Sequence, residues 1–152
     1  RSGVPRSVAV FQPLPEPLPP VIGRLQISRE ALRGCSVLVV EDDADARELL
    51  ALTLEEFGAL VQTAANAALG MEALQAGRFD VLVSDVSMPG EDGYSFVRRA
   101  RAAGFSLPSV ALTANARRED RERALAAGFG EHLTKPIEPL ELVAVLLRVL
   151  QR

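Results

Sequence analysis

Short apolar runs alternate with segments of helical periodicity along the chain from residue 34 onward. Continuous apolar runs are typical of strands covered on both faces, and glycines that follow the periodic segments are typical helix ends. The pattern predicts five strands: Ser36–Val40, Leu60–Ala64, Asp80–Ser84, Pro108–Leu112 and Glu131–Leu133. It predicts five helices: one capped by Asp43 or Asp45 and running to about Phe57, then Ala67–Gln75, Tyr94–Ala103, Arg117–Ala127 and Pro139–Leu150.

This alternation of strand and helix within residues 34–152 indicates one α/β domain, a doubly wound five-stranded parallel sheet with helices on both faces. Right-handed crossovers and short connections favour that arrangement over other layouts. In such sheets, ligands bind beyond the carboxyl ends of the strands, at the topological switch point. The candidate site is therefore expected at the strand ends.

The last predicted helix is apolar on more than one side. Helical spacing favours one set of residues for contact with the sheet, namely Leu140, Val143, Leu147 and Leu150. A second set would then lie partly outside as a candidate docking or homodimer surface, namely Leu142, Val145, Leu146 and Val149. The alternative is a broad core face that the N-terminal segment closes.

The N-terminal segment, residues 1–33, has a different composition from the rest of the chain. Six of the ten prolines lie in the first twenty residues, and five of these are in Pro13–Pro20. Alternating prolines favour an extended polyproline II spacer. We interpret residues 1–33 as a linker that carries the tail of an upstream domain, with Ser7–Phe11 as a short strand. A disordered tail without further role is the alternative.

Charge separates the same two regions: residues 1–33 are basic by three charges and the remainder is acidic by six. An acidic body argues against nucleic acid as a direct ligand, because phosphate contacts supply most of that affinity. No apolar run approaches the ~20 residues that span a bilayer. Cys35 is the only cysteine and is expected to be a small packing residue in a cytoplasmic, reducing setting.

Polar residues follow four of the predicted strands. Glu41-Asp42-Asp43 follow the first, Asp85 the third and Thr113 the fourth, while Lys135, the only lysine, follows the fifth. Acidic side chains gathered there would repel one another unless a cation neutralised them, and Mg²⁺ favours such hard oxygen ligands. Taken alone, the acids after the first strand would only decorate and cap a helix N-terminus.

Asp85 is the candidate nucleophile of this site. A carboxylate can attack phosphorus and form an acyl phosphate if its surroundings offset the charge of the phosphoryl oxygens. Mg²⁺ would take one oxygen, the Lys135 ammonium a second, and the Thr113 hydroxyl or a backbone amide a third. Lysine at this one position, in a chain with sixteen arginines, indicates a place that needs a compact ammonium.

From about Ser36 to Gln151 the sequence resembles the receiver domain of bacterial two-component response regulators. Such a domain has a flavodoxin-like fold with strand order 2-1-3-4-5. The matching runs, in order along the chain, are Val37–Asp43, Asp85–Gly93, Ala111–Ala114 and Leu133–Pro136.

The resemblance implies a role for each site residue. Asp85 would be the phosphoacceptor, Asp42 and Asp85 would ligate Mg²⁺ by side chain, Glu41 would act through water, and the Ser87 backbone carbonyl would be a ligand. Thr113 and Lys135 would contact the phosphoryl group. Three residues before the lysine, where the family often has an aromatic switch residue, this chain has His132.

The function that follows is a phosphoacceptor switch. A histidine kinase or phosphotransfer protein would donate phosphate to Asp85, and the face built by the last two strands and helices would respond. Residues 8–15 faintly resemble the last strand of a kinase ATP-binding domain, which favours the C-terminal receiver of a hybrid sensor kinase. The alternative is a free-standing receiver. Without a kinase histidine box or glycine motif, this chain is expected to perform only its own phosphorylation and dephosphorylation.

A haloacid-dehalogenase-like phosphatase is the alternative from another class, since it also uses a strand-end Asp, Mg²⁺ and a Lys. Such an enzyme would have a second Asp two residues after the nucleophile, where this chain has Ser87.

Overall fold

The computed structural model of the protein describes residues 27–151. Its centre is one parallel five-stranded sheet with strand order β2-β1-β3-β4-β5. The strands are β1 (Ser36–Val40), β2 (Leu60–Ala64), β3 (Val81–Asp85), β4 (Ser109–Thr113) and β5 (Glu131–Thr134). This order confirms the doubly wound, flavodoxin-like α/β fold.

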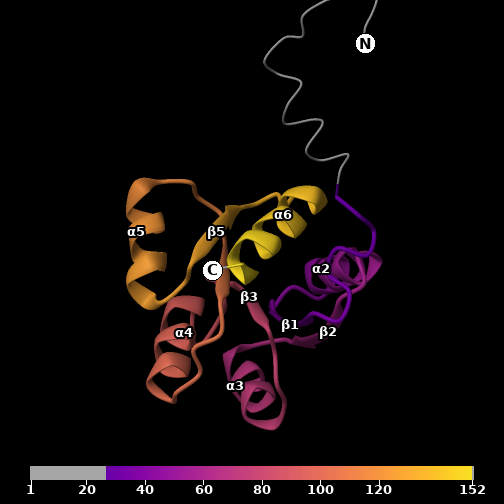
Figure 1. The fold of residues 1–152 in the computed structure, drawn as a ribbon. Coiled ribbons are helices and arrows are strands. Elements are labelled where there is room, and N and C mark those ends of the chain that lie inside the picture. Colours follow the sequence, from indigo (N-terminus) through magenta and orange to yellow (C-terminus); the bar gives the residue numbers. More distant parts are fainter. Residues whose placement is uncertain (1–26, 152) are drawn as a thin grey trace, which may run out of the picture.

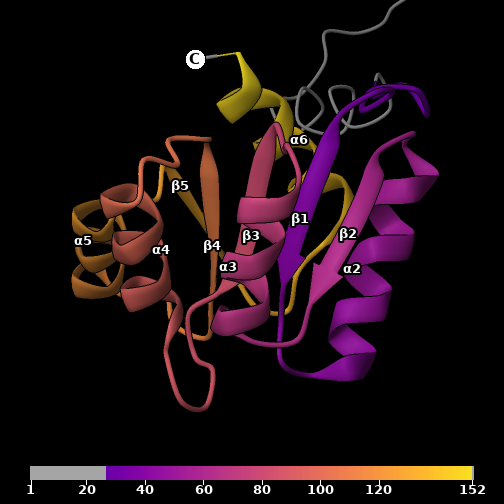
Figure 2. The same ribbon diagram turned by 90° about the horizontal axis from the view of Figure 1, so that it is seen from below.

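Five helices cover the two faces of the sheet (Figures 1 and 2). They are α2 (Ala44–Glu56), α3 (Ala67–Ala76), α4 (Gly93–Ala102), α5 (Arg118–Ala127) and α6 (Pro139–Leu150). Helices α2 and α6 lie on one face, and α3, α4 and α5 lie on the other. None of the helices within residues 27–151 is long and apolar enough to span a membrane.

Successive side chains along the strands point alternately into two hydrophobic cores, one on each face of the sheet. Along β1, Val37 and Val39 face α2 and α6, while Leu38 and Val40 face α3 and α4. All four are fully buried. A strand that is apolar at every position is required because both faces of the sheet are covered.

The predicted elements agree with the structure to within a residue or two at their ends. Asp43 is the N-cap of α2, and its side chain accepts hydrogen bonds from the amides of Asp45 and Ala46. Helix α5 ends at Gly128 in the left-handed conformation, with φ of 118°. The capping acid and the helix-ending glycine were therefore sufficient signals for these boundaries.

The face of α6 that packs on the sheet differs from the predicted one. Val143 is buried as expected, but Leu140, Leu147 and Leu150 are only partly buried. The residues predicted to lie partly outside are instead buried in the core, namely Leu142, Val145, Leu146 and Val149. A homodimer through α6 cannot use that predicted surface.

Part of the predicted linker packs against the α2 and α6 side of the domain. Leu32 is buried, donates its amide to the Phe57 carbonyl at 2.8 Å, and belongs to the same core as Leu142 and Leu146. Leu32 and the buried residues of α6 thus share one core, and the broad core face of α6 agrees with the alternative interpretation. The polyproline stretch and the short strand predicted at 7–11 lie outside the described residues.

Candidate functional site

The predicted site residues lie together at the carboxyl edge of the sheet. Glu41 and Asp42 follow β1, Asp85 is the last residue of β3, and Lys135 directly follows β5. The neighbouring strands β1 and β3 run in parallel register, with Val40 opposite Ser84. Residues that follow these two strands must therefore meet at the same edge.

Three carboxylates form an acidic cluster, defined here as Glu41, Asp42 and Asp85. One oxygen from each lies within 4.8 Å of the other two. Glu41 and Asp85 are buried, with relative exposures of 1% and 3%, whereas Asp42 is exposed. Carboxylate oxygens at this spacing, with one of them open to solvent, fit the ligand preference of Mg²⁺.

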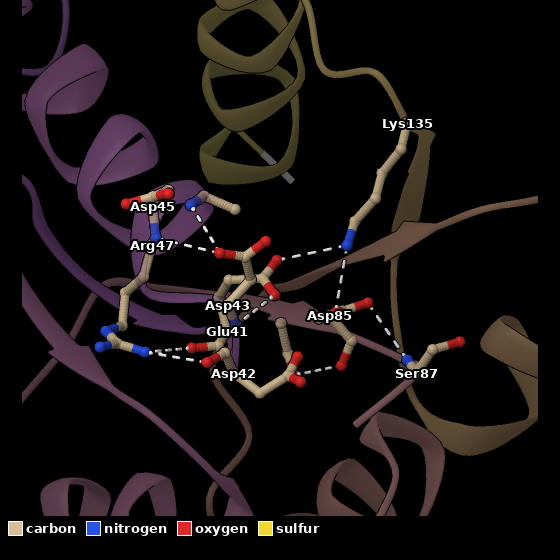
Figure 3. A network of polar contacts seen from close by, with 10 residues as sticks. Glu41, Asp42, Asp43, Asp45, Arg47, Asp85, Ser87 and Lys135 are labelled. Atoms are coloured by element: carbon tan, nitrogen blue, oxygen red, sulfur yellow. Dashed lines mark hydrogen bonds and ion pairs between the residues drawn. The ribbon is translucent and has the colours of Figure 1, made fainter. Parts of the chain in front are cut away.

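Lys135 is the cation that bridges the two buried acids. Its Nζ lies 3.1 Å from Asp85 Oδ2 and 3.3 Å from Glu41 Oε1 (Figure 3). Partial burial lowers the pKa of the ammonium, but the hydrogen bonds and charges of Asp85 and Glu41 together outweigh it and raise that pKa. Lys135 is thus a fixed positive charge that points at Asp85.

Glu41 is held in the site in spite of an unfavourable environment for its charge. Burial, reinforced by the charge of Asp85, raises the pKa of its carboxyl to about 7, although the Asp43 amide and Lys135 act in the opposite direction. The Asp43 amide donates to Oε2 at 3.2 Å. A buried carboxylate of this kind is stabilised when a further cation joins the cluster.

We therefore expect Glu41→Gln to stabilise the metal-free protein at alkaline pH. The folded-state pKa is raised from 4.5 to about 7. Ionised Glu41 therefore costs stability above pH 7, and the cost fades as the pH falls toward 4.5. At pH 8 the free energy of unfolding should rise by on the order of 1–3 kcal/mol. At pH 5 the gain should be several-fold smaller. Urea unfolding in the presence of a chelator measures the free energy of unfolding at both pH values. A Glu41→Gln protein that is less stable than the parent at pH 8 would contradict this expectation.

The loop after β3 is shaped around Asp85. The Ser87 amide donates to Asp85 Oδ1 at 3.1 Å, and the Gly93 amide donates to the Val86 carbonyl at 3.0 Å. A Cβ at Gly93 would collide with the Asp85 carbonyl oxygen. Only glycine lets α4 begin this close to Asp85. The expected role of the Ser87 carbonyl as a ligand stays a prediction.

Neither of the two residues expected to act as switches forms a hydrogen bond with Asp85 in the described part of the chain. Thr113 is buried, and its hydroxyl donates to the Asn115 carbonyl at 2.7 Å. Its own carbonyl accepts from the Lys135 amide, also at 2.7 Å. His132 lies in β5 opposite Ala111 and is partly exposed. Its place in a strand, not on an exposed helix, is unlike that of a donor histidine.

Two features of the site were not found from the sequence. Arg47 of α2 donates to the backbone carbonyls of Glu41 and Asp42 (Figure 3). Its position one helical turn after the cap residue Asp43 was the available signal. The second feature is a largely apolar pocket of about 310 Å³ beside Lys135, between α2 and the segment 136–142.

The sequence of this domain matches a known protein family. The family model described as "Response regulator receiver domain" matches residues 37–147. The chain belongs to this family. It is a receiver domain of two-component signalling systems. Receiver domains interact with histidine kinases or phosphotransfer proteins, and they generally bind Mg²⁺ at an acidic pocket.

Three similar proteins illustrate the range of the receiver family. An uncharacterized 14.6 kDa protein of Leptolyngbya boryana is 45% identical over 119 residues, 77% of this chain and 91% of that protein. Sensor histidine kinase RcsC of Escherichia coli is 38% identical over 101 residues, 66% of this chain but only 11% of the kinase. The solved structure of Vibrio cholerae chemotaxis response regulator CheY4 has a TM-score of 0.72 and 34% identity, covering 76% of this chain and 98% of that one.

Proposed function

We propose that this receiver domain accepts a phosphoryl group on Asp85 from a phosphohistidine donor and that Mg²⁺ is required. The observation that carries the proposal is the position of Asp85, buried between the Lys135 ammonium and two further carboxylates. A structural ion pair alone does not need two additional acids around it. An acceptor that must hold both a metal and a phosphoryl group does.

The residues present fit a magnesium ion. Asp42 and Asp85 would ligate it by side chain, the Ser87 carbonyl would be a third protein ligand, and Glu41 would act through a water molecule. The metal would supply positive charge to a phosphoryl oxygen. Mg²⁺ typically keeps several waters and takes only one or two carboxylates, which matches one exposed and two buried acids.

In the transfer itself, a carboxylate oxygen of Asp85 attacks phosphorus as the bond from phosphorus to the donor's imidazole nitrogen breaks. The phosphoryl group moves to Asp85, and the imidazole leaves with the electron pair and takes a proton from solvent. Lys135 offsets the charge on one phosphoryl oxygen. The hydroxyl of Thr113 would reach another oxygen after it leaves the Asn115 carbonyl, to which it now donates.

Movement of Thr113 would carry the signal outward. Lys135 and Thr113 are joined through the backbone at the ends of β5 and β4. A change at either one would shift the population of the face built from β4, α5, β5 and α6. His132, in the middle of this face, takes the place of the family's aromatic residue, and we propose that its ring responds to the move of Thr113.

The phosphohistidine donor would approach over α2. Leu49 and Leu52 are large apolar residues on this helix with relative exposures of 65% and 53%. Leu49 also lines the apolar pocket that opens beside Lys135 and Glu41. An apolar surface next to a charged centre fits a helix that presents one histidine to Asp85.

The wider context that we propose is the C-terminal receiver of a hybrid sensor kinase in the cytoplasm. The similarity to RcsC, whose matched part is a small fraction of that kinase, supports this context. The Pro-rich composition of residues 13–20 fits a linker between an upstream domain and the receiver.

Beryllofluoride, an analogue of the phosphoryl group, tests the site directly. With Mg²⁺ it should bind one site and shift the amide signals of residues 85–90 and 113–116. Asp42→Ala should weaken Mg²⁺ binding by at least about tenfold, because it removes a ligand. Asp45→Ala, which removes an exposed acid from the first turn of α2, is the matched control. Shifts confined to other regions, or unchanged Mg²⁺ binding by Asp42→Ala, would reject the assignment.

A further inference from the structure

Arg47 stands beside the acidic cluster but bonds the main chain and not a carboxylate. Its Nη1 donates to the Glu41 carbonyl at 2.8 Å and reaches the Asp42 carbonyl at 3.4 Å (Figure 3). Within residues 27–151, no ion pair joins Arg47 to an acid. The guanidinium is therefore used as a donor to the backbone that carries two members of the cluster.

These two carbonyls need such a donor because the sheet ends just before them. The Glu41 amide still donates to the Ala64 carbonyl at 3.1 Å, but β1 ends at Val40 and α2 starts at Ala44. In the described part of the chain, no backbone amide donates to the carbonyl of Glu41 or Asp42. Arg47 supplies hydrogen bonds where the sheet and the helix supply none.

The side chains of the two acids differ in how they are held. Glu41 is buried and accepts from the Asp43 amide and from Lys135. The exposed Asp42 carboxylate has no hydrogen-bond or ion-pair partner among the residues that the structure describes. The position of the Asp42 carboxylate therefore depends on its backbone, and Arg47 donates the hydrogen bonds that hold the carbonyls of this backbone.

We propose that Arg47 is a positioning residue: it fixes the backbone of Glu41 and Asp42 so that the Asp42 carboxylate stays in the acidic cluster. The inference rests on the proposed function, since it assigns Arg47 a part in holding Mg²⁺. It makes no contact with the phosphoryl group or the metal. Its effect passes through the two carbonyls to the orientation of Asp42.

An electrostatic role and a positioning role predict opposite changes in Mg²⁺ affinity when Arg47 is lost. Removing a positive charge beside three carboxylates should strengthen the binding of a divalent cation. Removing the two backbone hydrogen bonds should let Asp42 leave the cluster and so weaken the binding. The sign of the change in Mg²⁺ affinity therefore separates a positioning role from a merely electrostatic one.

The experiment measures Mg²⁺ affinity by calorimetry for the full chain and three variants. Arg47→Gln should weaken binding by about tenfold. Arg47→Lys, which keeps the charge and can donate to one carbonyl, should weaken it by a smaller factor. Arg98→Gln is the charge-matched control, because Arg98 is exposed on α4 and should have little effect on affinity. Unfolding midpoints show whether each variant is folded. If Arg47→Gln does not fold, the Mg²⁺ affinity of Arg47→Lys decides the test.

Hydrogen exchange of the metal-free protein separates this inference from the proposed function. Without Arg47, the amides of residues 42–44 should exchange several-fold faster than in the parent or in Arg98→Gln. Unchanged or tighter Mg²⁺ binding by Arg47→Gln would overturn the positioning role. A parent protein that binds no Mg²⁺ would contradict the proposed metal site. In that case, amide exchange of residues 42–44 that is the same with and without Arg47 would also contradict the proposal that Arg47 restrains this backbone.

Discussion

Asp85→Asn is expected to abolish covalent phosphorylation by a small donor such as acetyl phosphate. An amide is a far weaker nucleophile toward phosphorus than a carboxylate, so labelling should fall by at least about 100-fold. The fold should survive, because asparagine has nearly the same shape and its amide oxygen can still accept from the Ser87 amide. Phosphate-affinity gels measure the labelling, and hydroxylamine should remove it from the parent, as it does from an acyl phosphate.

Asp43→Asn is the matched control for this substitution. Asp43 lies next to the acidic cluster but serves as the N-cap of α2, a role that asparagine fills equally well. The control should be labelled like the parent. Labelling that persists in Asp85→Asn would place the acceptor elsewhere. If that label were also stable to base, His132 would be the residue to examine.

The position of the acidic cluster could be predicted because it depends only on strand order and strand ends. Glu41 and Asp85 follow apolar runs that are too short and too continuous to be surface helices, and neighbouring parallel strands end at one edge. Neither argument needs side-chain packing. The same holds for Lys135, whose predicted position at the end of β5 places its ammonium within reach of both buried acids.

The predicted face of α6 was wrong although the sequence carried a signal for the right one. Glu141 and Arg148, seven residues apart, are exposed and mark the solvent side of the helix. The buried residues follow the i, i+3, i+4, i+7 spacing of a core-facing helix: Leu142, Val145, Leu146 and Val149. The backbone contacts of Arg47 and the Thr113 hydroxyl bond to Asn115 could not be predicted for a different reason. They depend on loop geometry that has no sequence period.

Lys135→Arg should separate a specific role of the ammonium from simple charge balance. If Lys135 only neutralises Asp85 and Glu41, a guanidinium preserves the charge and the variant should respond to phosphorylation almost normally. If one compact ammonium must meet one phosphoryl oxygen, the larger planar group will be misplaced. The present contacts favour the second case, because a single Nζ lies within 3.3 Å of oxygens from two different carboxylates.

We therefore expect Lys135→Arg to keep its fold and its Mg²⁺ binding but to lose most of the phosphorylation-induced change in residues 111–150. Amide shifts on addition of beryllofluoride measure that change residue by residue. Thr113→Ala should be impaired in the same way but less severely, because a neutral hydrogen bond contributes only about 0.5–1.5 kcal/mol net. If Lys135→Arg and the parent switch equally, the ammonium acts only through its charge, and the single lysine of this chain has no special geometric role at the site.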